Sequence, residues 1–288
     1  MGVGPAMVVQ QHGSAAASAR AAVAAVAVAS VVVGVGGCGG GAAGGERNAD
    51  PTQTVRKAAD RLVREGSSHA RTSMEMASGG TRVTIHGEGV YDYRKGIGEL
   101  RVRLPQDAAG DEEHRPITEL LAPGALYMKN RGAGVPADKW VRVDITALTD
   151  GNLVTGGATD PLAAAELLRG ARNVTEQGEK DIAGVPTRHY KGDVELGVAA
   201  KAASATQRTA LAAAAKGFRE GRVPFDVYVD DEGLVRKVVH RFSFANGQPG
   251  KDVAVTSTTL YRGFGKPVKV RLPAKGDIFA GKVAEPGP

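Results

Sequence analysis

Cys38 is the single cysteine of the 288-residue chain, and its surroundings restrict what its sulfur can do. One cysteine excludes an intrachain disulfide. An uncharged run, residues 21–35, precedes it, and seven glycines and alanines, residues 39–45, follow it. The uncharged run has the length of a signal-peptide core and is short for a helix that must cross about 30 Å of hydrocarbon. The glycine-rich residues cannot pack and are typical of a flexible tether.

Four residues around this junction resemble the lipobox of bacterial lipoproteins, with an aliphatic residue, two small residues and then cysteine: Val35, Gly36, Gly37 and Cys38. The resemblance implies a signal peptide over 1–37, beginning at Met1 or further on at Met7. It also implies a diacylglyceryl group on Cys38 and a tether over 38–49. Two acyl chains suffice for stable anchoring, so we expect a protein held on the extracytoplasmic face of the cell membrane. The alternatives are a buried cysteine after an apolar helix and a plain transmembrane anchor.

The remaining residue types argue against catalysis and against nucleic acid. The formal net charge is +6, but basic and acidic residues are interspersed, without a basic patch that contains aromatics. The sequence lacks a Gly-x-Ser-x-Gly elbow and a Ser-x-x-Lys motif. Five histidines follow Cys38, and none has metal-ligand spacing: His69, His86, His114, His189 and His240. We expect no enzyme activity, no cofactor and no metal, and we interpret the acidic residues 230–232 as a turn.

From Asp50 onward the pattern indicates an α+β fold. A helix begins at Asp50-Pro51, a second at Asp160-Pro161, and an Ala-rich stretch over 197–222 has high helix propensity. Alternating residues between glycine-rich turns predict antiparallel strands. The expected strands cover residues 68–78, 81–93, 98–104, 117–121, 125–129, 140–145, 172–181, 185–196, 223–229, 234–245, 252–262 and 268–272. So many strands in one meander would curve strongly.

Three motifs in this order resemble the LppX/LprA/LprF/LprG lipoproteins of actinobacteria and, more distantly, the LolA/LolB lipoprotein-carrier fold. They are Asp160-Pro161-Leu162 before Leu167-Leu168, the segment 184–190 (GVPTRHY), and the hairpin 227–236 (VYVDDEGLVR). The resemblance implies a domain over 50–272, followed by a flexible tail over 273–288. It implies a strongly curved antiparallel sheet, a half-open β-barrel, with helices covering its concave face.

The same resemblance implies an apolar cavity that binds or carries acyl chains of a lipid or glycolipid, in a monomer. The alternative is a non-enzymatic binding or signalling lipoprotein of the same fold, with a filled core, that acts through its outer surface. Large or alternating side chains on the strands are the candidates for the cavity wall: Val83, Ile85, Tyr91, Tyr93, Tyr127, Trp140, Tyr190, Phe225, Val227, Phe242 and Phe244. Ordinary core packing is the other interpretation of each.

Overall fold

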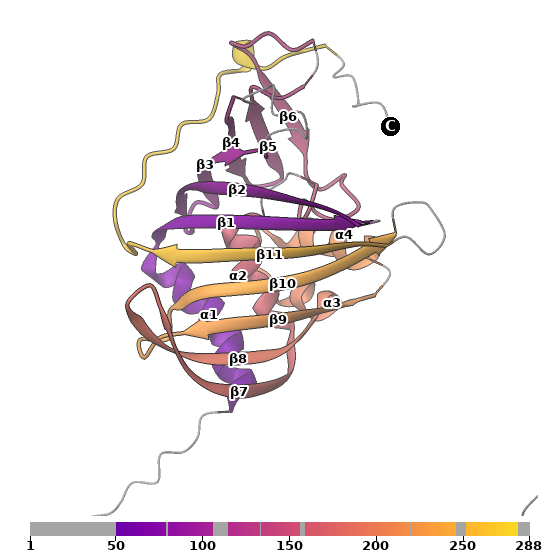
Figure 1. Cartoon of the computed structure of the whole chain (residues 1–288). Coiled ribbons are helices and arrows are strands. Elements are labelled where there is room, and N and C mark those ends of the chain that lie inside the picture. Colours follow the sequence, from indigo (N-terminus) through magenta and orange to yellow (C-terminus); the bar gives the residue numbers. More distant parts are fainter. Residues whose placement is uncertain are drawn as a thin grey trace, which may run out of the picture. The chain divides into compact units, whose positions relative to one another are not determined.

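The computed structural model describes residues 50–78, 80–105, 115–132, 134–155, 159–218, 220–245 and 252–281. All of them belong to one compact unit, Glu46–Pro288. The lipobox residues, Cys38 and the tether lie outside the described residues. Those that are described form an α+β fold, as predicted, with one large antiparallel sheet and four α-helices (Figure 1).

The sheet has eleven strands in the described part of the chain. They are β1 (Ser67–Ser78), β2 (Thr81–Asp92), β3 (Ile97–Arg103), β4 (Ile117–Ala122), β5 (Ala125–Lys129), β6 (Trp140–Asp144), β7 (Ala171–Ile182), β8 (Val185–Glu195), β9 (Arg222–Val229), β10 (Val235–Ala245) and β11 (Asp252–Arg262). Their order is β6-β5-β4-β3-β2-β1-β11-β10-β9-β8-β7. The sheet is therefore two meanders joined where β1 pairs with β11, and it is open because β6 and β7 stand at its two edges.

The helices begin at residues that cap them. In α1 (Pro51–Glu65) the Asp50 side chain accepts from the Thr52 N–H, and the helix ends at Gly66, whose φ is +87°. In α2 (Pro161–Leu167) the Asp160 side chain accepts from two backbone N–H groups. An Asp N-cap followed by proline satisfies free donors and fixes the first helical φ. The two predicted helix starts are thus confirmed.

One face of the sheet packs against these helices. The Tyr261 hydroxyl on β11 donates to the carbonyl of Pro161, 2.8 Å away, and the Tyr91 hydroxyl on β2 donates to Asp160, 3.0 Å away. On β2 the alternation is clear, because Ile85 and Tyr91 are buried while Glu88 is exposed. Successive side chains of a strand point to opposite faces, so the odd-numbered residues of β2 face the helices.

Two segments differ from the sequence predictions. The Ala-rich stretch forms two helices, α3 (Leu196–Ala202) and α4 (Arg208–Gly217), because the chain turns between them where the Ser204 N–H donates to Glu166. The predicted strand over 268–272 is wrong, since these residues pair with no strand. Among the described residues, no helix is long and apolar enough to cross a membrane.

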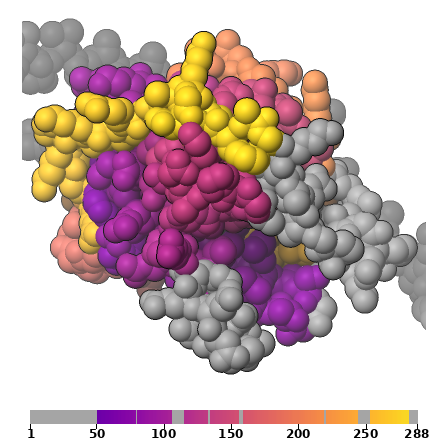
Figure 2. Space-filling view, turned by 90° about the horizontal axis from the view of Figure 1, so that it is seen from above, coloured from indigo at the N-terminus to yellow at the C-terminus, as the bar shows by residue number. Residues whose placement is uncertain are grey.

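The described residues after β11 contact the sheet again. They run back to β6, where Ile278 bridges Trp140 and the Phe279 N–H donates to the Trp140 carbonyl, 2.8 Å away. Figure 2 shows this yellow segment lying beside the magenta β4–β6 region. The contact gives a partner to backbone groups at the edge strand β6, which otherwise face solvent.

Candidate functional site

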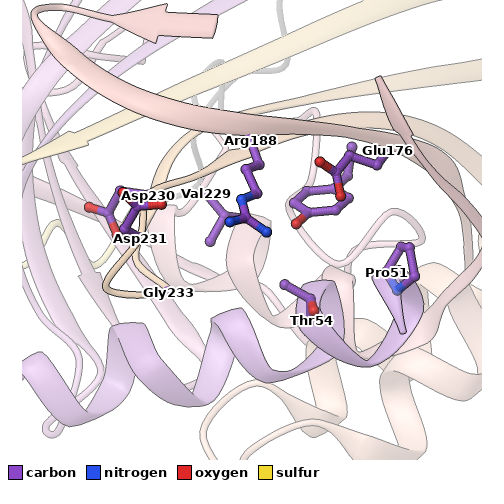
Figure 3. A pocket seen from close by; sticks show the side chains of 9 residues that line it. Pro51, Thr54, Glu176, Arg188, Val229, Asp230, Asp231 and Gly233 are labelled. Carbon is purple, nitrogen blue, oxygen red and sulfur yellow. The ribbon is translucent and has the colours of Figure 1, made fainter. Parts of the chain in front are cut away.

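A pocket of about 550 Å³ lies between the first turn of α1 and the end of the sheet that contains β7 (Figure 3). Its walls come from α1, β7, β8, β9 and the turn between β9 and β10. The lining residues are Pro51, Thr54, Glu176, Arg188, Tyr190, Val229, Asp230, Asp231 and Gly233.

Strand register brings these distant residues together. Glu176 on β7 is paired with Tyr190 on β8, and Arg188 on β8 is paired with Val229 on β9. Paired residues of antiparallel strands share a face, so these side chains point to the same side, toward α1. Figure 3 shows Arg188 beside Val229, above Thr54.

The pocket combines an apolar wall with charged groups at its mouth. Tyr190 and Val229 are 4% and 3% exposed and supply the apolar wall. Arg188, Glu176 and Asp231 are exposed. Burial raises the pKa of the Tyr190 phenol, the nearby Glu176 carboxylate adds to that rise, and the Arg188 guanidinium opposes it. Such an amphipathic pocket suits a ligand with an apolar part and a polar head.

Asp230 has a structural role in this pocket. One carboxylate oxygen accepts from the N–H groups of Glu232 and Leu234, at 3.0 and 2.9 Å, and the other pairs with the Arg236 guanidinium. Gly233 supplies the positive φ, +78°, that this turn needs. The interpretation of residues 230–232 as a turn is therefore confirmed. No group of three or more potential metal-ligating side chains occurs in the described ranges.

Most of the predicted cavity residues lie in a packed core between the sheet and the helices. Seven are buried there: Ile85, Tyr91, Tyr93, Tyr190, Phe225, Val227 and Phe242. Of these, Tyr190 lines the pocket. Val83 is half-buried against the same core. Tyr127 and Trp140 are half-buried on β5 and β6, and Tyr127 lies on the opposite face of its strand from the buried Leu126 and Met128. Phe244 belongs to β10, and its side chain lies outside the described part.

The core tyrosine Tyr91 is hydrogen-bonded to the start of α2 and packs against a second core tyrosine, Tyr93. Tyr91 and Tyr93 stack with ring centroids 5.1 Å apart. The Tyr91 hydroxyl and the Gln207 amide both donate to the same Asp160 oxygen, each at 3.0 Å. Burial raises the pKa of Asp160, and these hydrogen bonds oppose the rise. The network positions α2 on the sheet, so these tyrosines stabilise the fold at a distance from the pocket.

The same inner face contains buried polar side chains without a hydrogen-bond partner. Three of these side chains lie on adjacent strands: His240 on β10, with both ring nitrogens unpartnered, and the hydroxyls of Thr259 on β11 and Thr72 on β1. The fourth is Glu119 on β4, with both carboxylate oxygens unpartnered. Burial lowers the pKa of His240 to about 3 and raises the pKa of Glu119 to about 8, the latter opposed by Arg131. Both side chains are therefore neutral in the folded protein at pH 7.

The polar half of the pocket was not predicted from the sequence, although three of its residues lie inside the two motifs. Arg188 is part of the 184–190 motif, and Asp230 and Asp231 are part of the 227–236 hairpin. Glu119 was also missed. A signal for it exists, because Ile117, Glu119 and Leu121 alternate on β4 and the two flanking apolar residues predict a buried face.

No protein-family model and no curated protein matches the sequence. Among solved structures, the chain is similar to LprF from Mycobacterium bovis, with 15% identity, coverage of 78% of this chain and 97% of that one, and a TM-score of 0.41. The Mycobacterium tuberculosis lipoprotein LppX is 11% identical, the match covers 76% of this chain and 97% of that one, and the TM-score is 0.43. A LolA superfamily protein from Nitrosomonas europaea is 9% identical, the match covers 74% of this chain and 94% of that one, and the TM-score is 0.33.

Proposed function

We propose that this chain is a membrane-anchored, monomeric surface lipoprotein that binds acyl chains of a lipid without catalysing a reaction. The supporting observation is the amphipathic pocket of about 550 Å³ beside α1. Pockets for small ligands commonly measure about 300–1,000 Å³. Each part of an acyl chain that enters leaves water, which contributes roughly 25 cal/mol per Å² of apolar surface. Such binding is non-directional and needs no catalytic constellation.

The fold supports this proposal through the way α1 crosses the sheet. In the half-open barrel that we propose, the sheet would curve around α1 and α2, and α1 packs against the edge strand β7. The Arg56 guanidinium on α1 donates to the Ala171 carbonyl at the start of β7, at 2.8 and 3.0 Å, and fixes the helix there. A ligand would enter between the first turn of α1 and β8, with its acyl part against Tyr190 and Val229.

The test is native mass spectrometry on the chain from residue 38 onward, carrying Cys38→Ser, after incubation with phospholipid vesicles. The unmodified pocket should retain lipid. Thr54→Trp places a large ring in the pocket and should reduce retention severalfold. Gln53→Trp adds the same ring to an exposed position of α1 outside the pocket and should leave retention unchanged. Circular dichroism confirms that both variants fold. Apo protein alone would refute the proposal.

The second candidate is a binding or signalling lipoprotein of the same fold that acts through its outer surface. The observation in its favour is the packed core, in which Tyr91 and Phe225 are fully buried. It is preferred if the protein retains no lipid under the conditions above.

A further inference from the structure

The pocket contains opposite charges that do not neutralise each other. Among the described residues, Arg188 makes no ion pair, and neither does Glu176, whereas Asp230 is paired with Arg236. Two opposite charges in one pocket usually approach each other unless strand geometry separates them. Here each charge stays available to a ligand, so Arg188 offers a cationic point and Glu176 an anionic point, while Asp231 adds a second exposed carboxylate on the turn between β9 and β10.

Strand register sets the backbone positions of the two points. Glu176 is paired across the strands with Tyr190, and Arg188 lies two residues before Tyr190 on the same face of β8. Two residues of a strand span about 7 Å and neighbouring strands lie about 5 Å apart, so the Cα atoms of Glu176 and Arg188 are diagonal neighbours about 8–9 Å apart. This separation suits a ligand head in which a negative and a positive group are joined by a short linker.

Each point also has a neighbour that favours one half of such a head. At the anionic point, Glu176 is paired across the strands with Tyr190, and its carboxylate is close enough to add to the rise of the Tyr190 pKa. An ammonium group between a carboxylate and an aromatic face gains both ion pairing and a cation–π interaction. At the cationic point, the Arg188 guanidinium lies above the Thr54 side chain. A guanidinium offers parallel donors to phosphate oxygens, and a hydroxyl adds one more.

From this arrangement we propose that the pocket selects zwitterionic phospholipids, with the phosphate at Arg188 and the ammonium at Glu176 and Tyr190. The inference rests on the proposed function, since it assumes that a lipid enters the pocket. An anionic lipid without an ammonium group leaves the Glu176 carboxylate facing a negative head. A neutral lipid such as diacylglycerol uses neither charge. Because Arg188 and Glu176 are exposed, the selectivity is modest and falls with salt.

The experiment is a competition between headgroups. The chain from residue 38 onward, carrying Cys38→Ser, is incubated with vesicles of phosphatidylcholine and phosphatidylglycerol in equal amounts, with one tenth diacylglycerol. All three lipids carry the same acyl chains. The protein is separated from the vesicles, and its retained lipids are quantified by mass spectrometry. We expect phosphatidylcholine to be enriched about five-fold over phosphatidylglycerol, relative to the vesicles.

Two variants assign the enrichment to the two points. Glu176→Gln should abolish the preference for phosphatidylcholine over phosphatidylglycerol while total lipid is retained. Glu232→Gln removes an exposed carboxylate that does not line the pocket and should keep the preference. Arg188→Gln should reduce both phospholipids relative to diacylglycerol, and Arg101→Gln, at an exposed position of β3 far along the sheet, should not.

The outcomes separate this inference from the proposed function. Lipid retained in the vesicle ratio, or a preference that survives Glu176→Gln, overturns the headgroup assignment and leaves lipid binding intact. Absence of retained lipid refutes both. Soluble glycerophosphocholine at the same concentration should displace no lipid, because it lacks acyl chains. If it displaces lipid, the site recognises a free headgroup and the assignment to a phospholipid is wrong.

Discussion

Glu119 lies on the buried face of β4, and neither of its carboxylate oxygens has a hydrogen-bond partner. Burial raises its pKa from 4.5 to about 8. The folded chain therefore holds a proton on Glu119 at pH 7, whereas the unfolded chain releases it. Folding takes up this proton, so the contribution of Glu119 to stability is fully present below pH 4.5 and is lost as the pH rises toward 8.

The magnitude follows from these two pKa values. Between them, each pH unit lowers the free energy of unfolding by about 1.4 kcal/mol. From pH 5 to pH 7 the loss is about 2.5 kcal/mol. Glu119→Gln keeps the shape of the side chain and removes the titration. The advantage of Glu119→Gln over the unmodified protein should therefore grow by about 2.5 kcal/mol over this range.

The assay is urea unfolding of both proteins at pH 5, 6 and 7, followed by fluorescence of Trp140. Taking the difference between the two proteins cancels the titration of all other groups. Glu232→Gln, at an exposed turn position, is the control, and its difference should stay within about 0.5 kcal/mol at every pH. A difference for Glu119→Gln that does not change with pH would refute the burial of an ionisable carboxyl at this position.

Three further predictions concern other positions. The pKa of His240 is lowered to about 3, so its contribution to stability is lost as the pH falls below 6.5. In the same assay, the difference in free energy of unfolding between His240→Phe and the unmodified protein should shift by about 2 kcal/mol in favour of His240→Phe from pH 7 to pH 5. A Cβ at Gly89 would stand 1.8 Å from the Glu99 carbonyl oxygen, so Gly89→Ala should lower the free energy of unfolding by about 3 kcal/mol in urea. Gly197→Ala, with open space around the new Cβ, should not destabilise the protein. Cys38→Ser should release the protein into the medium or leave it unprocessed, and normal cleavage with membrane fractionation would contradict a lipid anchor on that sulfur.

The elements of the fold could be predicted from local signals. The Asp160-Pro161 pair fixes a helix start through capping and a preset φ, wherever α2 later packs. The turn over 230–233 is specified by its own residues, because the Asp230 side chain accepts a backbone hydrogen bond and Gly233 adopts a positive φ. These signals act within a few residues, so a single sequence displays them. The break between α3 and α4 within the Ala-rich stretch is less local, since the Ser204 N–H donates to Glu166 of another helix.

The pocket could not be predicted in the same way. Pro51, Tyr190 and Asp230 are far apart in the chain, and their meeting depends on the order of the strands and on the bulges in the β7–β8 pairing. Alternation assigns Tyr91 and Phe225 correctly to the inner face of the sheet. It does not tell whether that face borders a void or a helix, because this depends on how closely the small residues of α2 and α3 approach. In the described part of the structure no such void borders these two side chains, because the rings of Tyr91 and Phe225 are fully buried.

The position of the pocket along the chain adds an argument for its ligand. Pro51 is both the first residue of α1 and part of the pocket, and only residues 39–50 separate it from Cys38. The thirteen residue steps from Cys38 to Pro51 reach at most about 47 Å when fully extended. A diacylglyceryl group on Cys38 would therefore hold the pocket mouth within that distance of the bilayer. Lipid headgroups are the ligands present there at high local concentration, so even the modest, salt-sensitive selectivity of Arg188 and Glu176 would be sufficient to sort them.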